Sequence, residues 1–244
     1  KNRMIACSTA AGPAFEGAKI ECGMRGTIGA IDHVRYADGA FQCHVISAGS
    51  DQNPGFRSAG SETEADQGSW TKAAGICGSG LMDVVAAALD AEVIDDMGKI
   101  DPNHPCVYIR EENGQPAIRL IDGVYLSQKD IREVQLAKGA VAAGIELLAG
   151  ELGILLKDLR RVMIAGAFGN YMDPHSACRI GMIPMELEDR IEMIGNAAGE
   201  GSIMATLNHD EFLHAQKIRE EVQFLELASS PDFQDTFVDN LMFE

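Results

Sequence analysis

Short apolar segments alternate with long helical segments along this sequence, and the alternation limits the chain to folds that combine sheet and helix. The clearest helix follows Ser127-Gln128-Lys129-Asp130, which has the form of a capping box. This helix extends to about Glu151, with Ile131 and Val134 on its apolar face. A buried strand is expected soon afterwards, at residues 162–165. We therefore expect a mixed α/β fold, a mixed sheet flanked by helices, with hairpin insertions.

Two tight turns predict the hairpins. Asp38-Gly39 and Asn113-Gly114 each separate two segments of strand character, and both dipeptides favour two-residue turns. The strands expected at these turns are 31–36 with 41–47, and 107–110 with 117–121. Further strands are expected at 3–7, 191–194 and 222–227. Residues 8–18 are expected to form a turn that opens a helix, and residues 49–69 a loop. The other expected helices are 81–89, 174–180, 200–207, 211–221 and 231–242.

Charge and cysteine spacing exclude several classes of function. The chain of 244 residues has a formal net charge of −17, which disfavours nucleic acid and anionic membrane surfaces as partners. No apolar run reaches the length of a membrane span. The six cysteines include no Cys-x-x-Cys pair, so we expect neither a metal site nor an iron–sulfur cluster in this chain. These features are typical of a cytoplasmic protein with reduced thiols.

A strand that runs directly into small residues is the first candidate site. Residues 162–165 lead into Gly166 and Gly169, followed by Asn170. Ligands of α/β proteins bind at the carboxyl ends of strands, and glycines there let a flat ligand lie against the backbone. An ordinary strand-to-helix turn explains the same glycines equally well.

The glycines before the helix at 81–89 form a second candidate site. Gly78, Ser79 and Gly80 would place free N–H groups at a helix start, where anions are favoured. No Gly-Lys-Ser/Thr follows, so this is not a P-loop. The alternative is a helix packed closely on a neighbouring element.

Two further positions are weaker candidates. Gly12 and Pro13 precede Glu16, which is placed to face a ribose hydroxyl or a hydrated cation, or to be a solvated carboxylate in a first helical turn. Lys138 lies at the spacing of the apolar face of the long helix. It either points at a nucleotide or extends its charged end to solvent. No group of residues for nucleophilic catalysis stands out, so the catalytic residues stay unknown.

Six segments together resemble one family, the reductive activators of corrinoid-dependent enzymes, in their C-terminal part. The segments occur in order and span most of the chain: 7–18, 75–83, 126–132, 135–138, 165–171 and 195–199. The resemblance implies the superfamily of acetate and sugar kinases, heat-shock cognate proteins and actin (ASKHA), whose lobes are actin-like and ribonuclease H-like.

The resemblance also implies a function. It implies that ATP or ADP with Mg²⁺ binds in a cleft between two lobes. It implies that ATP hydrolysis drives an electron from a [2Fe-2S] domain to cob(II)alamin on a corrinoid protein, which returns it to cob(I)alamin. Gly166, Gly169 and Asn170 would then belong to the adenosine motif. Lys138 and Glu16 would point at the ribose or phosphates, and Gly78-Ser79-Gly80 would lie near the cleft.

The family pattern also contains parts that this sequence lacks. An Asp-x-Gly-Thr phosphate loop, the first lobe and the iron–sulfur domain are missing, so residues 1–244 are expected to be the C-terminal nucleotide-binding lobe of a larger protein. We expect this chain alone not to hydrolyse ATP at a useful rate. A non-catalytic domain that docks a corrinoid protein is the alternative. An activator of the 2-hydroxyacyl-CoA dehydratase kind needs cysteines closer together, and a homodimer stays open.

Overall fold

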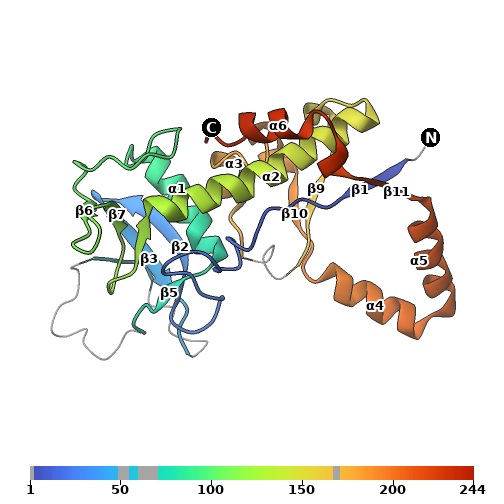
Figure 1. The fold of residues 1–244 in the computed structure, drawn as a ribbon. Coiled ribbons are helices and arrows are strands. Elements are labelled where there is room, and N and C mark those ends of the chain that lie inside the picture. Colours follow the sequence, from blue (N-terminus) through green and yellow to red (C-terminus); the bar gives the residue numbers. More distant parts are fainter. Residues whose placement is uncertain (1–2, 49–54, 60–70, 167–170) are drawn as a thin grey trace.

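The computed structural model describes residues 3–48, 55–59, 71–166 and 171–244, and it has the α/β class that the sequence predicts (Figure 1). The strands are β1 (Met4–Cys7), β2 (Ala30–Ala37), β3 (Ala40–Val45), β4 (Arg57–Ser58), β5 (Gly75–Ile76), β6 (Val107–Ile109), β7 (Pro116–Arg119), β8 (Tyr125–Ser127), β9 (Val162–Ile164), β10 (Ile191–Met193) and β11 (Val222–Leu225). The helices are α1 (Gly78–Asp90), α2 (Gln128–Leu152), α3 (Pro174–Arg179), α4 (Ala197–Leu207), α5 (His209–Glu221) and α6 (Phe233–Asp239).

The strands are distributed over four small sheets. Their orders are β4-β3-β2-β5, β6-β7-β8, β10-β9 and β1-β11, and the last two sheets are parallel pairs. Both predicted hairpins are confirmed, as β2–β3 and β6–β7. At the first hairpin Asp38 and Gly39 have positive φ angles of 53° and 78°, which suits the right-handed twist of the flanking strands.

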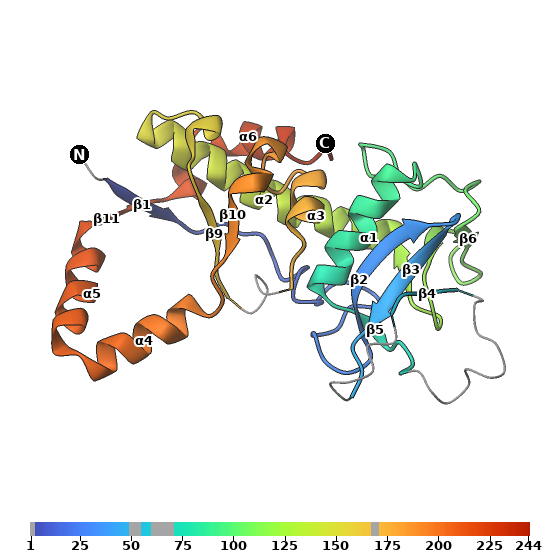
Figure 2. The ribbon, with the colours of Figure 1, turned by 180° about the vertical axis from the view of Figure 1, so that it is seen from behind.

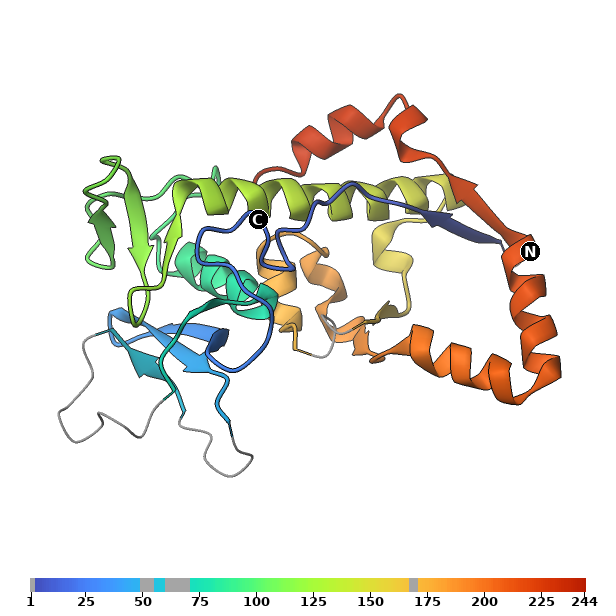
Figure 3. The same cartoon turned by 60° about the horizontal axis from the view of Figure 1, so that its bottom comes forward.

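Helix α2 spans the long axis of the molecule and contacts elements at both ends (Figures 1 and 3). The predicted capping box is confirmed, because Ser127 and Asp130 exchange their side-chain and backbone hydrogen bonds. Gly153 ends the helix in the left-handed conformation, with a φ angle of 66°. Ile131 and Val134 are fully buried, so the predicted apolar face does pack on the core.

The main core lies between α1 and β2. Leu81, Val84 and Val85 of α1 and Ile31 of β2 are at most 1% exposed. Burying each such side chain contributes about 1.5–3 kcal/mol before conformational entropy is subtracted. The helix approaches the strand closely at Gly80, where a Cβ atom would lie 2.4 Å from the carbonyl oxygen of Ile31.

The prediction of a helix that opens within residues 8–18 is wrong. The segment forms consecutive turns instead, in which the N–H of Gly17 donates to Ala14 and that of Ala18 to Pro13. Gly12 and Gly17 have φ angles of +71° and +79°, which an α-helix does not accommodate. The short strands β4, β5 and β8 were also not anticipated, and most of the predicted loop at 49–69 lies outside the described residues.

Helices α4 and α5 form an arm that projects from the rest of the molecule (Figures 1 and 2). They pack on each other, and neither helix contains a buried residue. Across the described part of the chain, every helix is too short or too polar to cross a membrane.

Candidate functional site

The carboxyl ends of β9 and β10 carry two glycine turns that meet. The strands are parallel, with Val162 opposite Ile191 and Ile164 opposite Met193, so they end at the same edge. Gly166 follows β9 with a φ angle of 100°, and Gly195 follows β10 with a φ angle of 63°. The N–H of Gly166 donates to the carbonyl oxygen of Gly195 at 2.7 Å. The two turns therefore form one backbone surface at this edge.

Gly166 is half-buried, and a Cβ atom built on it would meet no heavy atom of the described residues within 4 Å. Its positive φ, rather than crowding, accounts for glycine here, and the open space leaves room for a flat ligand against the backbone. Beside it, Asn196 caps α4 by accepting from the N–H of Gly199 at 3.1 Å. The predicted Gly169 and Asn170 lie outside the described residues.

A histidine–aspartate pair connects β2 with α1. His33 Nδ1 on β2 is 3.0 Å from Asp83 Oδ2 on α1, and α1 packs against α3. The hydrogen bond to Asp83 raises the pKa of His33 despite partial burial, and the charges of Asp83, Asp32 and Asp173 act in the same direction. The His33 imidazole thus pairs with the buried Asp83 side chain, and this pairing favours the protonated form of the imidazole.

This pair was missed by the sequence analysis. A single carboxylate, Asp83, within the apolar segment 81–89 is the signal that was available. Buried carboxylates are rare unless they are paired, so its position already implied a partner. The other carboxylate oxygen, Asp83 Oδ1, is buried and has no hydrogen-bond partner among the described residues.

Close packing explains Gly80 at the start of α1. Gly78, Ser79 and Gly80 are all buried. Gly80 packs against the backbone of β2, where a Cβ atom would lie 2.4 Å from the carbonyl oxygen of Ile31. The N-cap residue Cys77 makes no side-chain cap, and its sulfur lies 3.4 Å from Ser79 Oγ. The close-packing alternative therefore accounts for Gly80, and an anion at this motif stays a prediction.

Lys138 is buried and is bound by the C-terminal segment. It is 1% exposed, and its ammonium group donates to the carbonyl oxygen of Met242. The same group lies 5.7 Å from the centre of the Phe243 ring. Burial lowers the pKa of Lys138 to about 8, and the nearby Glu244 opposes this shift. Lys138 thus does not extend to solvent, and a nucleotide contact stays a prediction.

The two candidates near the N-terminus lie in or beside the turns at 13–19. Gly12 has a φ angle of +71°, and a Cβ atom at this position would meet no heavy atom within 4 Å in the part of the chain that the structure describes. Glu16 is exposed. These features fit both a ligand contact and a solvated carboxylate. A cavity of about 750 Å³ lies elsewhere, beside Phe243 and Arg179, and its described lining contains none of the predicted site residues.

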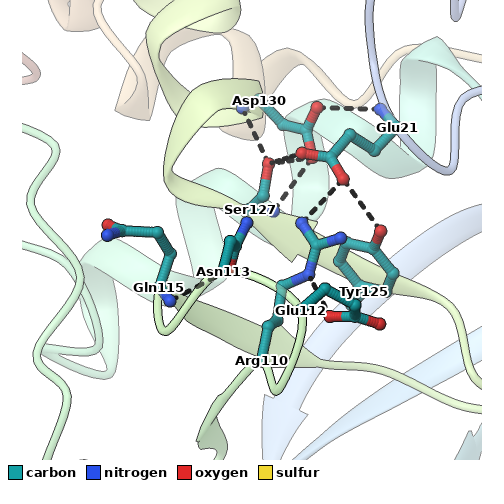
Figure 4. Close-up of polar contacts among 8 residues, drawn as sticks. All are labelled: Glu21, Arg110, Glu112, Asn113, Gln115, Tyr125, Ser127 and Asp130. Atoms are coloured by element: carbon teal, nitrogen blue, oxygen red, sulfur yellow. Dashed lines mark hydrogen bonds and ion pairs between the residues drawn. The ribbon is translucent and has the colours of Figure 1, made fainter.

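A polar network fixes the start of α2 to the turns near the N-terminus (Figure 4). Glu21 accepts from Tyr125 at 2.9 Å and from Arg110 at 2.7 Å, and Ser127 Oγ lies 3.0 Å from its other oxygen. Burial opposes ionisation of Glu21, but these hydrogen bonds prevail and lower its pKa. The N–H of Glu21 donates to Asp130 at 2.8 Å. All of these groups are used within the fold, so the network is structural.

The mixed α/β architecture, with parallel strands whose glycine turns meet at one edge, agrees with the ASKHA class, and the comparisons show this class. Residues 1–244 match the family model described as the C-terminal domain of RACo, the ASKHA domain. The chain belongs to this family.

Named relatives point to one kind of protein. The chain is 33% identical to the corrinoid activation enzyme RamQ of Eubacterium limosum, over 99% of this chain and 40% of that protein. It is 30% identical to a [Co(II) methylated amine-specific corrinoid protein] reductase of Methanosarcina barkeri, over 75% of this chain and 32% of that protein. A solved structure, the reductive activator for a corrinoid, iron-sulfur protein, matches with a TM-score of 0.79 and 28% identity, over 98% of this chain and 36% of that one. The chain thus spans about two fifths or less of the length of these relatives.

Proposed function

We propose that this chain is the C-terminal nucleotide-binding lobe of a longer, ATP-dependent reductive activator that returns cob(II)alamin on a corrinoid protein to cob(I)alamin. The observation that carries the proposal is the family match over residues 1–244, together with relatives named for corrinoid activation and reduction. The reaction adds one electron to the cobalt, and a reduced [2Fe-2S] cluster in another part of the longer protein is its proposed source.

The proposed nucleotide site is the edge formed by Gly166 and Gly195. The face of Gly166 fits the adenosine portion. Gly169 and Asn170, which follow in sequence, are proposed to belong to the same adenosine motif. Backbone N–H groups at the start of α4 favour the negative charge of phosphates. Gly12 and Glu16 are proposed to approach the same ligand from the turns at 13–19. When bound with Mg²⁺, ATP supplies the free energy of its hydrolysis.

The other proposed contacts require a rearrangement of the fold. Gly78, Ser79 and Gly80 are buried at the start of α1. A ligand can therefore contact them only if the first turn of α1 becomes exposed. Lys138 reaches a nucleotide only if its hydrogen bond to Met242 is broken. The groups that position Mg²⁺ and the attacking water are proposed to come from outside residues 1–244.

The test uses the full-length protein with its corrinoid partner. We expect ATP to bind in a calorimetric titration, and the cob(II)alamin absorption to convert to that of cob(I)alamin only when both ATP and a reductant are present. Binding of the corrinoid protein without any ATP binding would instead establish a non-catalytic docking domain. Reduction at the same rate without ATP would contradict the proposal.

A further inference from the structure

The cavity of about 750 Å³ has no role in the proposed nucleotide site. Residues of the segment 89–103, at the end of α1 and after it, form most of its wall. Arg179 of α3 and the C-terminal residues Phe243 and Glu244 complete the wall, because the chain returns there beside α3 (Figure 1). The volume lies within the range of natural ligand sites, about 300–1,000 Å³. The cavity is therefore large enough for a ligand or for side chains of a partner protein.

Backbone contacts fix the wall of the cavity. Ile94 and Ile100 form an antiparallel bridge that closes the segment after α1 into a loop. The N–H of Phe243 donates to the carbonyl oxygen of Asp96 at 2.9 Å, and this bond ties the C-terminal residues to the loop. Binding sites are usually preformed in this way, so a partner would meet the cavity already built.

The cavity has an apolar floor and an acidic rim. Its buried apolar side chains are each at most 8% exposed: Leu89, Ile94, Ile100 and Phe243. Its charged side chains are exposed, apart from the half-buried Arg179. They comprise five carboxylates and two cations, a net charge of −3: Glu92, Asp95, Asp96, Asp101 and Glu244, with Lys99 and Arg179. An apolar floor below a negative rim suits a long side chain or ligand that ends in a cation.

The negative charge at the rim is not compensated within the fold. Arg179 is engaged elsewhere, because its Nε lies 2.6 Å from Asp90 Oδ1. Glu92 and Asp96 form no ion pair with any other described residue. Nor does any group of three His, Cys, Asp or Glu side chains in the described ranges have an arrangement that could hold a metal ion. The carboxylates therefore suit several separate cationic groups better than one bound ion.

We propose that this cavity is the docking site for a basic segment of the corrinoid protein, whose Lys or Arg side chains lay their alkyl stems on the apolar floor and place their charges at Glu92 and Asp96. The inference rests on the proposed function, which makes a corrinoid protein the partner. Long basic side chains bury their stems and keep their charged ends in water, as the exposed rim requires. The chain's net charge of −17 also attracts a basic surface over a long range and speeds its encounter with the rim.

Other occupants match the cavity less well. A second copy of the chain carries the same charge of −17, and two such surfaces repel each other. Nucleotides and other phosphates are negative, so the rim disfavours them as well. A free alkylamine offers the same ammonium group as a lysine side chain, but it fills only a small part of a cavity of about 750 Å³.

Calorimetric titration of the full-length protein with its corrinoid protein tests the rim. The variant Glu92→Gln/Asp96→Asn neutralises two rim carboxylates. Glu111→Gln/Asp158→Asn is the matched control, because both residues are exposed, lie outside the cavity and lose the same charge. We expect affinity for the corrinoid protein to fall by about tenfold or more in the rim variant and by less than about twofold in the control. We expect the difference to shrink as salt is raised to about 0.5 M.

The same titrations define the results that would overturn the docking site. Equal losses in both variants would show that net charge alone attracts the partner, and no loss in either would show that the rim is not used. Binding of cadaverine that leaves the affinity for the corrinoid protein unchanged would assign the cavity to a free amine instead. In each case ATP-dependent reduction by the unaltered protein decides the proposed function separately.

Lysine footprinting of the unaltered proteins provides a test that needs no variant. Lys99 lines the cavity, and Lys157 is equally an exposed lysine but lies outside the lining. We expect saturating corrinoid protein to slow acetylation of Lys99 by about fivefold or more, as for a side chain covered by an interface, and to leave Lys157 unchanged. Unchanged acetylation of Lys99 in the complex would overturn the proposal.

Discussion

The backbone N–H of Gly166 donates a 2.7 Å hydrogen bond to the carbonyl oxygen of Gly195, so the turns after β9 and β10 are fixed to each other. This bond links positions 29 residues apart in sequence and creates one glycine-lined edge where two parallel strands end. The proposed nucleotide site depends on the geometry of this edge.

The first prediction concerns Gly166→Ala in the full-length protein. With a φ angle of +100° at this position, an alanine strains the backbone by about 1–3 kcal/mol and displaces the turn. We expect ATP affinity to fall by about tenfold or more, since 1.4 kcal/mol corresponds to a factor of ten. Isothermal titration measures it. Gly153→Ala is the control, because Gly153 also has a positive φ angle and open space at Cβ but ends α2. Equal affinities in both variants would contradict the assignment.

The second prediction compares two helical glycines. Gly80→Ala would bring a Cβ atom within 2.4 Å of the Ile31 carbonyl oxygen, and backbone cannot yield as a flexible side chain does. We expect the free energy of unfolding to fall by about 1–3 kcal/mol, as for overpacking. Gly150→Ala meets no heavy atom within 4 Å in α2 and should be stabilising by about 0.4–1 kcal/mol. Denaturant titration of both variants checks the difference, and similar effects would show that α1 and β2 are less closely packed.

The third prediction is a pH dependence that comes from Lys138. Its pKa is lowered from 10.5 to about 8 in the folded protein, so the unfolded chain binds more protons between these two values. The contribution of Lys138 to stability therefore increases as pH rises from 8 to 10.5, by up to about 3 kcal/mol. We expect the stability of the native protein relative to Lys138→Met to increase over this range. Urea titrations at about pH 7 and about pH 10 measure the difference, and a constant difference would contradict the burial of the charged amine.

The fourth prediction concerns the network at the start of α2. Asp130→Ala removes the capping box and leaves the buried N–H of Ser127 and the N–H of Glu21 without their acceptor. We expect a loss of about 2–4 kcal/mol, which combines a lost cap with unpaired donors. Asn208→Ala removes only an exposed cap of α5 and should cost about 1 kcal/mol. Thermal denaturation of the two variants compares them, and equal costs would show that the network adds nothing to the cap.

Much of the fold follows from local chemistry and could be predicted. The capping box of Ser127 and Asp130 and the turn at Asp38-Gly39 depend on groups close together in sequence. The apolar spacing of Ile131 and Val134 likewise predicted their burial. The family and its ASKHA class were also recognisable, because the motifs occur in a fixed order along the chain.

The sequence left other choices open that local chemistry does not decide. Gly12 and Gly17 are compatible with a turn or a helix start, and the structure selects turns with positive φ angles. Gly80 fits an anion site or close packing; the nearness of the Ile31 carbonyl explains the glycine by packing, and an anion there stays a prediction. Neither the neighbouring Ile31 carbonyl nor the backbone angles at Gly12 and Gly17 can be read from the sequence around these glycines.

The sequence by itself determined most of the helices, the hairpins and the family, since these depend on neighbouring residues and on motif order. Only the tertiary structure decided the pairings between distant positions. His33 meets Asp83 across 50 residues, and Lys138 meets the Met242 carbonyl across 104. Spacing along the chain carries no information about such contacts, because they are set by how α1 packs on β2 and how the C-terminal segment folds back on α2. The physical reason is that a buried charge takes whichever partner the packing brings within hydrogen-bond distance.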